Sequence, residues 1–397
     1  MAQESILEIK DLEVKFYTYA GVVEALDGVN LSIRRGEILG LVGETGSGKS
    51  VTSLSVMMLV PPPGKIENGG IYFRSKGKTQ NIMSLNDASL RDIRGKDISM
   101  IFQEPRAYLN PVYSVKDQIS EVMLVHRKQE FLQKAIEALQ KKGRGKSFEA
   151  SVYRRVLKTE NSVATGSASR FSRNRLLAWM TRIGQRIGTN FMSKFTRKKT
   201  LKSEITKEVV RVLKDVEISD PDRVAIMYPH ELSGGMAQRV IIAMALACNP
   251  TMLIADEPTT NLDVTVQAQI LNLIKLLKKD YNSSILYITH DLGVVAQTCD
   301  RVAVMYAGNV VETAEVVETY KSPLHPYTRA LLESIPSPGK EFKSIPGIVP
   351  GLINPPTGCR FHERCNYAKE ICLTSKPVFR EVKKDHFVAC YLYGGSN

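Results

Sequence analysis

The feature that most constrains the fold is an apolar strand that runs into a glycine-rich loop and then into a helix. Residues 37–42, EILGLV, have the composition of a buried strand, and GETGSGKS follows directly. Val51 to Leu59 continue as an apolar helical stretch. This order is the context that G-x-x-x-x-G-K-[ST] requires, in which loop N–H groups and a helix N-terminus bind phosphate oxygens. The sequence therefore predicts a nucleotide-phosphate site, with a simple glycine-rich turn as the alternative.

The loop residues have individual expected roles. Lys49 should reach the β- and γ-phosphates of a nucleotide, and Ser50 should bind Mg²⁺. The glycines let the backbone curl around the phosphates. The residues expected to bind ATP here are Gly43, Glu44, Thr45, Gly46, Ser47, Gly48, Lys49, Ser50 and Val51.

A second apolar strand ends in two carboxylates. MLIADEP, which begins at Met252, places Asp256 and Glu257 at the carboxyl end of that strand. Asp256 is positioned to hold Mg²⁺, and Glu257 to orient or deprotonate the attacking water. Capping of the next helix is the alternative for such a pair, and the phosphate loop upstream favours the catalytic interpretation.

Strand and helix patterns alternate on both sides of a helical stretch that begins at Val115. Alternation of this kind predicts an α/β layer with a mostly parallel sheet. The helical stretch interrupts it and is expected to form its own subdomain. We expect a first part of an ATP-binding core at 1–95, a helical subdomain at 96–228, a second part of the core at 229–320 and a C-terminal extension at 321–397.

LSGGMAQR, from Leu232 to Arg239, together with the two motifs above resembles the signature of ABC-type ATPases over about residues 5–335, except for a basic segment at 126–205. The resemblance implies a RecA-like P-loop core with an N-terminal antiparallel β part and an inserted helical subdomain. It also implies a head-to-tail pair of such domains, with ATP held between them. The signature residues that would meet the γ-phosphate from the opposite domain are Ser233, Gly234 and Gly235.

The same resemblance assigns further residues. Gln103 in IFQEP matches the Q-loop, which binds Mg²⁺ and senses the γ-phosphate. Asp263 in NLD matches the D-loop, and His290 in ITHD matches the switch histidine, which hydrogen-bonds the γ-phosphate. Because Glu257 and the other catalytic positions are all filled, the resemblance implies ATP hydrolysis.

Family members stack the adenine ring on an aromatic residue upstream of the phosphate loop. Phe16 is the predicted platform, and Tyr17 and Tyr19 are competitors. A strand aromatic that packs in the core is the alternative interpretation of Phe16.

SPLHPYTRALLESIP, from Ser322 to Pro336, and PGLINPPTGCRFHERC are similar to the ATPases of oligopeptide and dipeptide importers, and to their D-type subunit in particular. The resemblance implies three kinds of partner: a second, homologous ATPase, two membrane permeases and an extracellular solute-binding protein. Related importers of oligosaccharides or nickel are alternatives. A soluble ABC-type ATPase that acts on nucleic acid or ribosomes is a less favoured one, because this chain has a single nucleotide-binding unit.

The net charge of +13 comes from one basic insertion. Residues 126–205 hold 20 Lys and Arg against 5 Asp and Glu, a net of +15, so the remainder carries −2. Residues 144–175 mix Ser, Gly and Arg and are predicted to be flexible. A basic amphipathic helix is expected over 175–191. It could pack on the helical subdomain or contact anionic lipid or a permease. Nucleic-acid binding is a third, disfavoured role.

The chain has no run of about 18 uncharged apolar residues, which a membrane span needs. Its N-terminus, MAQESILEIK, contains acidic residues and no long apolar stretch, so no secretory signal is expected. We therefore expect a peripheral protein at the cytoplasmic face of the cell membrane.

Four of the six cysteines lie in the C-terminal extension. Disulfides are disfavoured in the cytoplasm, and zinc sites usually contain a closer pair of cysteines than any found here. Four thiolates at looser spacing suit a [4Fe–4S] cluster, and some importer ATPases with a similar tail are reported to hold one. We expect such a cluster to lock the tail, with zinc and free thiols as alternatives. The expected ligands are Cys359, Cys365, Cys372 and Cys390.

Overall fold

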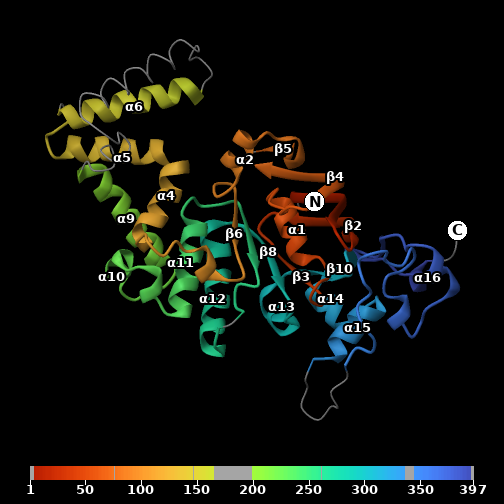
Figure 1. The fold of residues 1–397 in the computed structure, drawn as a ribbon. Helices are drawn as coiled ribbons and strands as arrows, with labels where there is room; N and C mark the ends of the chain where they lie inside the picture. The colour runs from red at the N-terminus through yellow and green to blue at the C-terminus, as the bar shows by residue number, and fades with distance from the viewer. Residues whose placement is uncertain are drawn as a thin grey trace. The chain divides into compact units, whose positions relative to one another are not determined.

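The computed structural model of the chain describes residues 4–75, 77–145, 147–164, 199–260, 262–335 and 344–394. The chain divides into two compact units. One unit consists of Met1–Tyr108 together with Asn249–Asn397, and the other consists of Leu109–Cys248. The first unit holds both sheets (Figure 1).

An antiparallel sheet opens the first unit, as the resemblance implied. Its strand order is β2-β1-β4-β5. Along β1 buried apolar residues alternate with more exposed ones, so one face of the sheet contributes to the core. The strands are β1 (Ser5–Thr18), β2 (Gly21–Arg34), β4 (Gly64–Ser75) and β5 (Lys78–Asn81).

The second sheet has eight strands in the order β11-β12-β10-β9-β3-β8-β7-β6. From β9 to β6 all neighbours are parallel, whereas β9, β10, β12 and β11 pair antiparallel. In Figure 1 β3 and β8 lie side by side although they are far apart in sequence. Every residue of β3, β7 and β8 is buried, which is typical of strands covered on both faces. The strands are β3 (Ile38–Val42), β6 (Ile98–Ile101), β7 (Met252–Asp256), β8 (Ser284–Thr289), β9 (Arg301–Tyr306), β10 (Asn309–Glu315), β11 (Arg380–Lys383) and β12 (His386–Val388).

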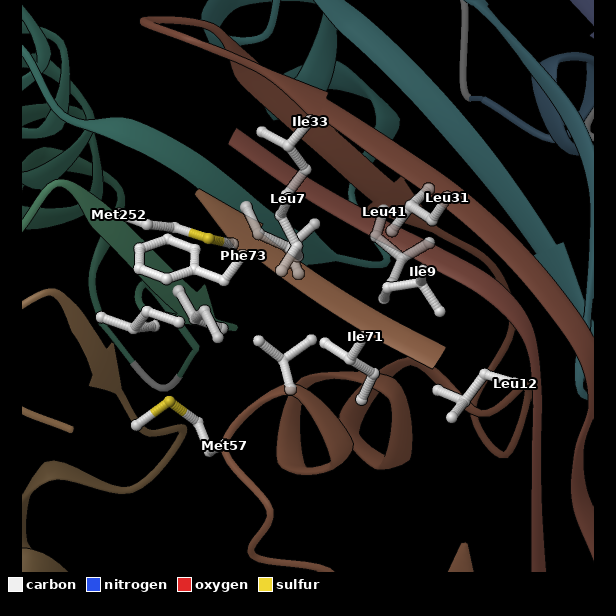
Figure 2. Packing of buried hydrophobic residues seen from close by; sticks show 14 of the residues in the cluster. Leu7, Ile9, Leu12, Leu31, Ile33, Leu41, Met57, Ile71, Phe73 and Met252 are labelled. Atoms are coloured by element: carbon white, nitrogen blue, oxygen red, sulfur yellow. The ribbon is translucent and has the colours of Figure 1, made fainter. Parts of the chain in front are cut away.

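One apolar cluster joins the two sheets. Figure 2 shows Leu7, Ile9 and Phe73 of the antiparallel sheet gathered with Leu41 of β3 and Met252 at the start of β7. Burial of such side chains stabilises a fold by roughly 25 cal/mol per Å² of apolar surface. The cluster therefore anchors β3 and β7, the two strands that lead into the predicted site.

The helices of the first unit begin at side-chain caps in several places. Asn86, Asp263 and Asp291 each accept a hydrogen bond from the backbone N–H three residues on. The helices are α1 (Lys49–Val56), η1 (Ile82–Ser84), α2 (Asp87–Ile93), α3 (Pro105–Tyr108), α12 (Val264–Tyr281), α13 (Leu292–Thr298), α14 (Val316–Lys321), α15 (Pro326–Glu333), η3 (His362–Arg364), α16 (Glu370–Thr374) and η4 (Tyr391–Tyr393).

The second unit is helical in the residues that the structure describes, as predicted from Val115 onward. Arg127 ties its helices together, because its guanidinium donates to Glu208 on α9 at 2.8 Å and to the carbonyl of Ala247 at 2.8 Å. The helices are α4 (Val115–His126), α5 (Lys128–Lys141), α6 (Phe148–Ala164), α9 (Lys199–Asp215), α10 (Pro221–Ile226), η2 (Pro229–Glu231) and α11 (Gly234–Leu246).

The unit boundary differs from the sequence-based one. The signature helix α11 was assigned to the second part of the ATP-binding core, but it packs on α4 and α9 and belongs to the unit Leu109–Cys248. The apolar residues of α11 lie on almost all sides of the helix, so α11 must pack against other elements on several sides.

The predicted flexibility of residues 144–175 is wrong for their first part. Residues 148–164 form α6, whose Ala150 and Tyr153 are fully buried and which packs on α5. The apolar residues at helical spacing outweigh the Ser- and Arg-rich composition. The basic amphipathic helix expected over 175–191 lies outside the described residues.

The C-terminal extension joins the first unit through the sheet. β12 pairs with β10, and Ile353 forms an isolated bridge with Val23 of β2. None of the helices in the described part of the chain is both long enough and apolar enough to span a membrane.

A buried polar group fixes where the extension begins. The Glu312 carboxylate on β10 accepts hydrogen bonds from the backbone N–H groups of Leu324 and His325 at 2.8 Å, and from His386 Nε2 at 2.7 Å. Burial alone would raise the pKa of Glu312, but the hydrogen bonds, led by that of His386, lower it. Burial lowers the pKa of His325 to about 4, so this imidazole is neutral near pH 7.

We expect the stability of the first unit to fall as the pH decreases from 7 to 4. In the unfolded chain His325 becomes protonated near its ordinary pKa of about 6.5, whereas in the folded chain it becomes protonated only near pH 4. The unfolded state therefore binds more protons in this window, and the loss is on the order of 3 kcal/mol. Urea unfolding followed by circular dichroism at several pH values measures it.

A His325→Asn variant should be less stable at pH 7 and show a flatter decline toward pH 4. His230→Asn, an exposed histidine in the other unit, controls for the loss of one histidine. Equal slopes for His325→Asn and the wild type would contradict the prediction.

Candidate active site

The loop between β3 and α1 depends on glycine at two positions. A Cβ at Gly43 would overlap the carbonyl oxygen of Met305, and one at Gly48 would lie 2.9 Å from that of Ala25. Gly48 also has a φ of 102°, and it precedes α1 without a side-chain cap. The first N–H groups of α1 are therefore not occupied by a capping side chain, as an anion site at a helix N-terminus requires.

Lys49 is held along this loop. Its Nζ donates to the backbone carbonyls of Gly43 at 2.8 Å and Glu44 at 3.0 Å. Burial lowers the pKa of Lys49, whereas the carboxylates of Glu257 and Asp256 oppose that shift. An ammonium group in this position faces the centre of the loop rather than bulk solvent.

Asp256 and Ser50 meet across neighbouring elements. Ser50 Oγ at the start of α1 lies 3.3 Å from Asp256 Oδ1 at the end of β7, and Ser53 Oγ lies 3.4 Å from Oδ2. Burial raises the pKa of Asp256, and the hydrogen bond from Ser50 opposes that shift. A carboxylate and a hydroxyl side by side are oxygen ligands of the kind that Mg²⁺ prefers.

Glu257 is the point on which three other side chains converge. Its carboxylate accepts hydrogen bonds from Gln103 Nε2 at 3.0 Å, Thr260 Oγ1 at 3.0 Å and His290 Nδ1 at 3.1 Å. Its backbone is left-handed, with a φ of 46°, which is costly for a residue with a side chain. The structure thus brings together Glu257, Gln103 and His290, which sequence reasoning had selected from three separate motifs.

The signature and D-loop residues begin helices. Ser233 Oγ accepts a hydrogen bond from the N–H of Met236 at 3.3 Å and caps α11, whose first residues Gly234 and Gly235 are not fully buried. Asp263 caps α12 in the same way, through the N–H of Val266 at 2.9 Å. The N-terminus of α11 is therefore open to solvent within its own unit.

The three candidate aromatic platforms differ in exposure. Phe16 packs against the core cluster, and its ring would lie 2.6 Å from a Cβ at Gly64. Tyr17 is half-exposed and donates to Glu67 at 2.8 Å, whereas Tyr19 is fully exposed at the turn between β1 and β2. The choice of Phe16 stays a prediction, and the two tyrosines offer the more open rings.

The four cysteines of the extension line one small cavity of about 10 Å³, together with His362. None of these four cysteines forms a disulfide. Burial raises the pKa of Cys359 to about 12 and also raises those of Cys365 and Cys390. Across the described residues, no group of three or more His, Cys, Asp or Glu side chains has the arrangement of a metal site.

Sequence reasoning missed four side chains that contact the site. Thr260 and Ser53 each lie three residues from a predicted residue, so a helical or turn spacing was the available signal. Tyr327 accepts a hydrogen bond from the N–H of Glu44 at 2.9 Å, and Arg364 pairs with the Glu44 carboxylate. No local pattern links these two residues with the loop.

Comparisons with known proteins identify the family of the chain. The family model described as ABC transporter matches residues 26–260, and that of the oligopeptide/dipeptide transporter C-terminal region matches residues 311–372. A probable peptide ABC transporter ATP-binding protein of Sinorhizobium fredii is 39% identical over 391 residues, which cover 97% of this chain and 94% of that protein. The oligopeptide transport ATP-binding protein of Bacillus subtilis is 41% identical over 392 residues, which cover 98% and 88%.

The fold also has solved counterparts. A dimeric ATP-binding cassette bound to ADP and Pi in a post-hydrolysis state aligns with a TM-score of 0.52 and 22% identity, over 78% of this chain and 98% of that one. At this identity the likeness concerns the fold alone. The chain therefore belongs to the ABC transporter family and carries the C-terminal region of its oligopeptide and dipeptide transporters.

Proposed function

We propose that this chain is the ATP-hydrolysing subunit of an importer of di- and oligopeptides. The observation that carries the proposal is the meeting of Ser50 and Asp256 beside the loop that holds Lys49. It gives one place for the phosphates and for Mg²⁺. The relatives named for peptide transport support the substrate class, and no observation favours oligosaccharides or nickel.

Each residue has a proposed task in hydrolysis. Lys49 and the loop N–H groups bind the β- and γ-phosphates, while Ser50, Asp256 and Gln103 hold Mg²⁺, which neutralises charge on the phosphate oxygens. Glu257 orients the attacking water and accepts its proton. The hydrogen bonds from Thr260 and Gln103 hold that carboxylate in place, and His290 contacts the γ-phosphate.

A second cassette would complete the site. Ser233, Gly234 and Gly235 at the open N-terminus of α11 suit a γ-phosphate bound by a partner ATPase, because helix N-termini attract anions. A solved cassette of this fold is a dimer, which supports a pair of cassettes. We further propose two permeases and an extracellular solute-binding protein as partners, with this chain at the cytoplasmic face of the membrane. Lipid contact would come from the basic insertion.

Replacement of Glu257 tests the chemistry. In the complex purified from detergent-solubilised membranes, Glu257→Gln should keep ATP binding but hydrolyse at least about a hundredfold more slowly, because the amide cannot accept the proton. The complex that carries Glu257→Gln should retain its bound ATP through size exclusion, because the pair stays closed. Lys49→Ala is the control that loses binding as well, and turnover near the wild-type rate in Glu257→Gln would show that Glu257 is not the base.

The partners are tested in the same preparation. Affinity capture of the full chain should recover two permease subunits and a second ATPase. Nuclease-sensitive RNA or DNA in place of permeases would overturn the importer and favour an ATPase that acts on nucleic acid.

We also propose that Cys359, Cys365, Cys372 and Cys390 bind a [4Fe–4S] cluster with a structural role. This proposal is supported by the fact that all four cysteines line one cavity. The volume of that cavity is about 10 Å³, so a cluster must widen it. A bound metal would deprotonate these thiols, whose pKa values are raised for Cys359, Cys365 and Cys390.

Metal analysis of anaerobically purified protein tests the cluster. Brown protein with about four irons per chain is expected, and Cys390→Ser should lose the iron. Cys248→Ser, in the other unit, is the matched control and should keep it. Colourless protein that contains zinc, or no metal, would overturn the cluster in favour of a zinc site or free thiols.

A further inference from the structure

We propose that Arg364 and Tyr327 of the C-terminal region position the phosphate loop through Glu44, so that this region forms part of the nucleotide site. Arg364 and Tyr327 are positioning residues that act through the loop. The inference rests on the proposed phosphate-binding role of residues 43–50. It assigns the extension a task in ATP binding.

Glu44 is held by all three of its polar groups. Its carbonyl accepts from Lys49 Nζ at 3.0 Å, and its N–H donates to the hydroxyl of Tyr327 at 2.9 Å. Its carboxylate receives two hydrogen bonds from Arg364, at 2.8 and 3.1 Å. The second residue of the loop is thus tied to the extension on two sides.

Arg364 is built into the extension. Its side chain is 4% exposed, and its Nε donates to the carbonyl of Pro346 at 2.8 Å. One amino group also donates to the hydroxyl of Tyr306 at 3.2 Å, and the guanidinium lies 5.7 Å from the Tyr306 ring centre and 5.9 Å from that of Phe361. A bidentate pair in such a setting is far more constrained than a surface ion pair, which contributes little.

Tyr327 reaches the loop from the start of α15. Its ring is fully buried and packs on Tyr306 and Phe361, with centroids 4.6 and 5.3 Å away. His325 caps the helix by accepting from the N–H of Tyr327 at 3.1 Å, and Pro326 is the first helical residue. The sequence His-Pro-Tyr therefore starts the helix and aims one hydroxyl at Glu44.

The charge of Glu44 makes Arg364 matter for ATP. The Glu44 side chain is 29% exposed and belongs to the loop that is to receive several negative charges. The Glu44 carboxylate and the phosphates of a bound nucleotide are both negative and therefore repel each other, and this repulsion is stronger in a partly buried setting than in water. Arg364 neutralises the carboxylate, so its loss leaves a negative charge next to the phosphates.

The charge pair predicts a specific pattern of ATP affinities in the full-length protein. Arg364→Met should weaken ATP binding on the order of tenfold, and the deficit should shrink at high salt because screening weakens the repulsion. Glu44→Gln should bind ATP more tightly than Arg364→Met does. The double variant should recover most of the loss, since the amide does not repel phosphate. Isothermal titration calorimetry with ATP measures all four proteins.

A merely structural role would give a different pattern. In that case the double variant would bind ATP no better than Arg364→Met, which overturns the proposal. Arg360→Met is the matched control, because this buried arginine of the same segment pairs with the carboxylates of Glu24 and Asp27 and donates to the carbonyls of Glu24 and Ala307, rather than to Glu44. It should lower the melting temperature and leave ATP affinity unchanged.

Two further proteins keep the test decisive. Tyr327→Phe removes only the hydroxyl and should weaken ATP binding by about threefold, through the loss of one hydrogen bond to the loop. It serves if Arg364→Met does not fold. Lys49→Ala separates the two proposals: if the wild type binds ATP and Lys49→Ala does not, the loop binds phosphate as proposed. Wild-type affinity in both Arg364→Met and Tyr327→Phe would then overturn this inference alone.

Discussion

The parallel register of β3, β8 and β7 is the constraint on which the rest of the molecule depends. Parallel strands end at the same edge of a sheet, so the loop after β3 and the carboxylates after β7 must meet there. The hydrogen bond between Ser50 and Asp256 is the direct result of that register. Because β8 lies between the two strands, it also brings His290 to the same edge, where it contacts Glu257. The apolar cluster that joins the two sheets packs against these strands and stabilises their register.

Contiguous motifs could be predicted from the sequence, and contacts between distant segments could not. Local geometry determines each motif that spans only a few consecutive residues. These motifs are the phosphate loop, the carboxylates at the end of β7 and the capped helix at Ser233. The Arg364–Glu44 pair joins residues 320 positions apart, and no spacing pattern announces it. The helix α6 was missed for another reason, since the Ser- and Arg-rich composition of residues 144–175 as a whole concealed apolar residues at helical spacing within α6.

The extension and the ATP-binding core share one buried layer. Tyr306 of β9, Tyr327 of α15 and Phe361 pack on one another, and Arg364 lies across two of these rings. Glu312 of β10 fixes the start of α15 by accepting hydrogen bonds from the backbone N–H groups of Leu324 and His325. The C-terminal region is thus a continuation of the central sheet rather than an appendage on it. Cys359 and Cys365 lie on either side of the short helix that carries Arg364, and Cys365 is the residue next to it.

The pairing of Glu44 with Arg364 also bears on the order in which a ribosome delivers the chain. The phosphate loop precedes its neutralising arginine by 320 positions in the chain. A chain that stops before Arg364 therefore leaves the Glu44 carboxylate without this partner. Under the proposed role of Arg364, such a truncated chain would bind ATP more weakly than the full chain.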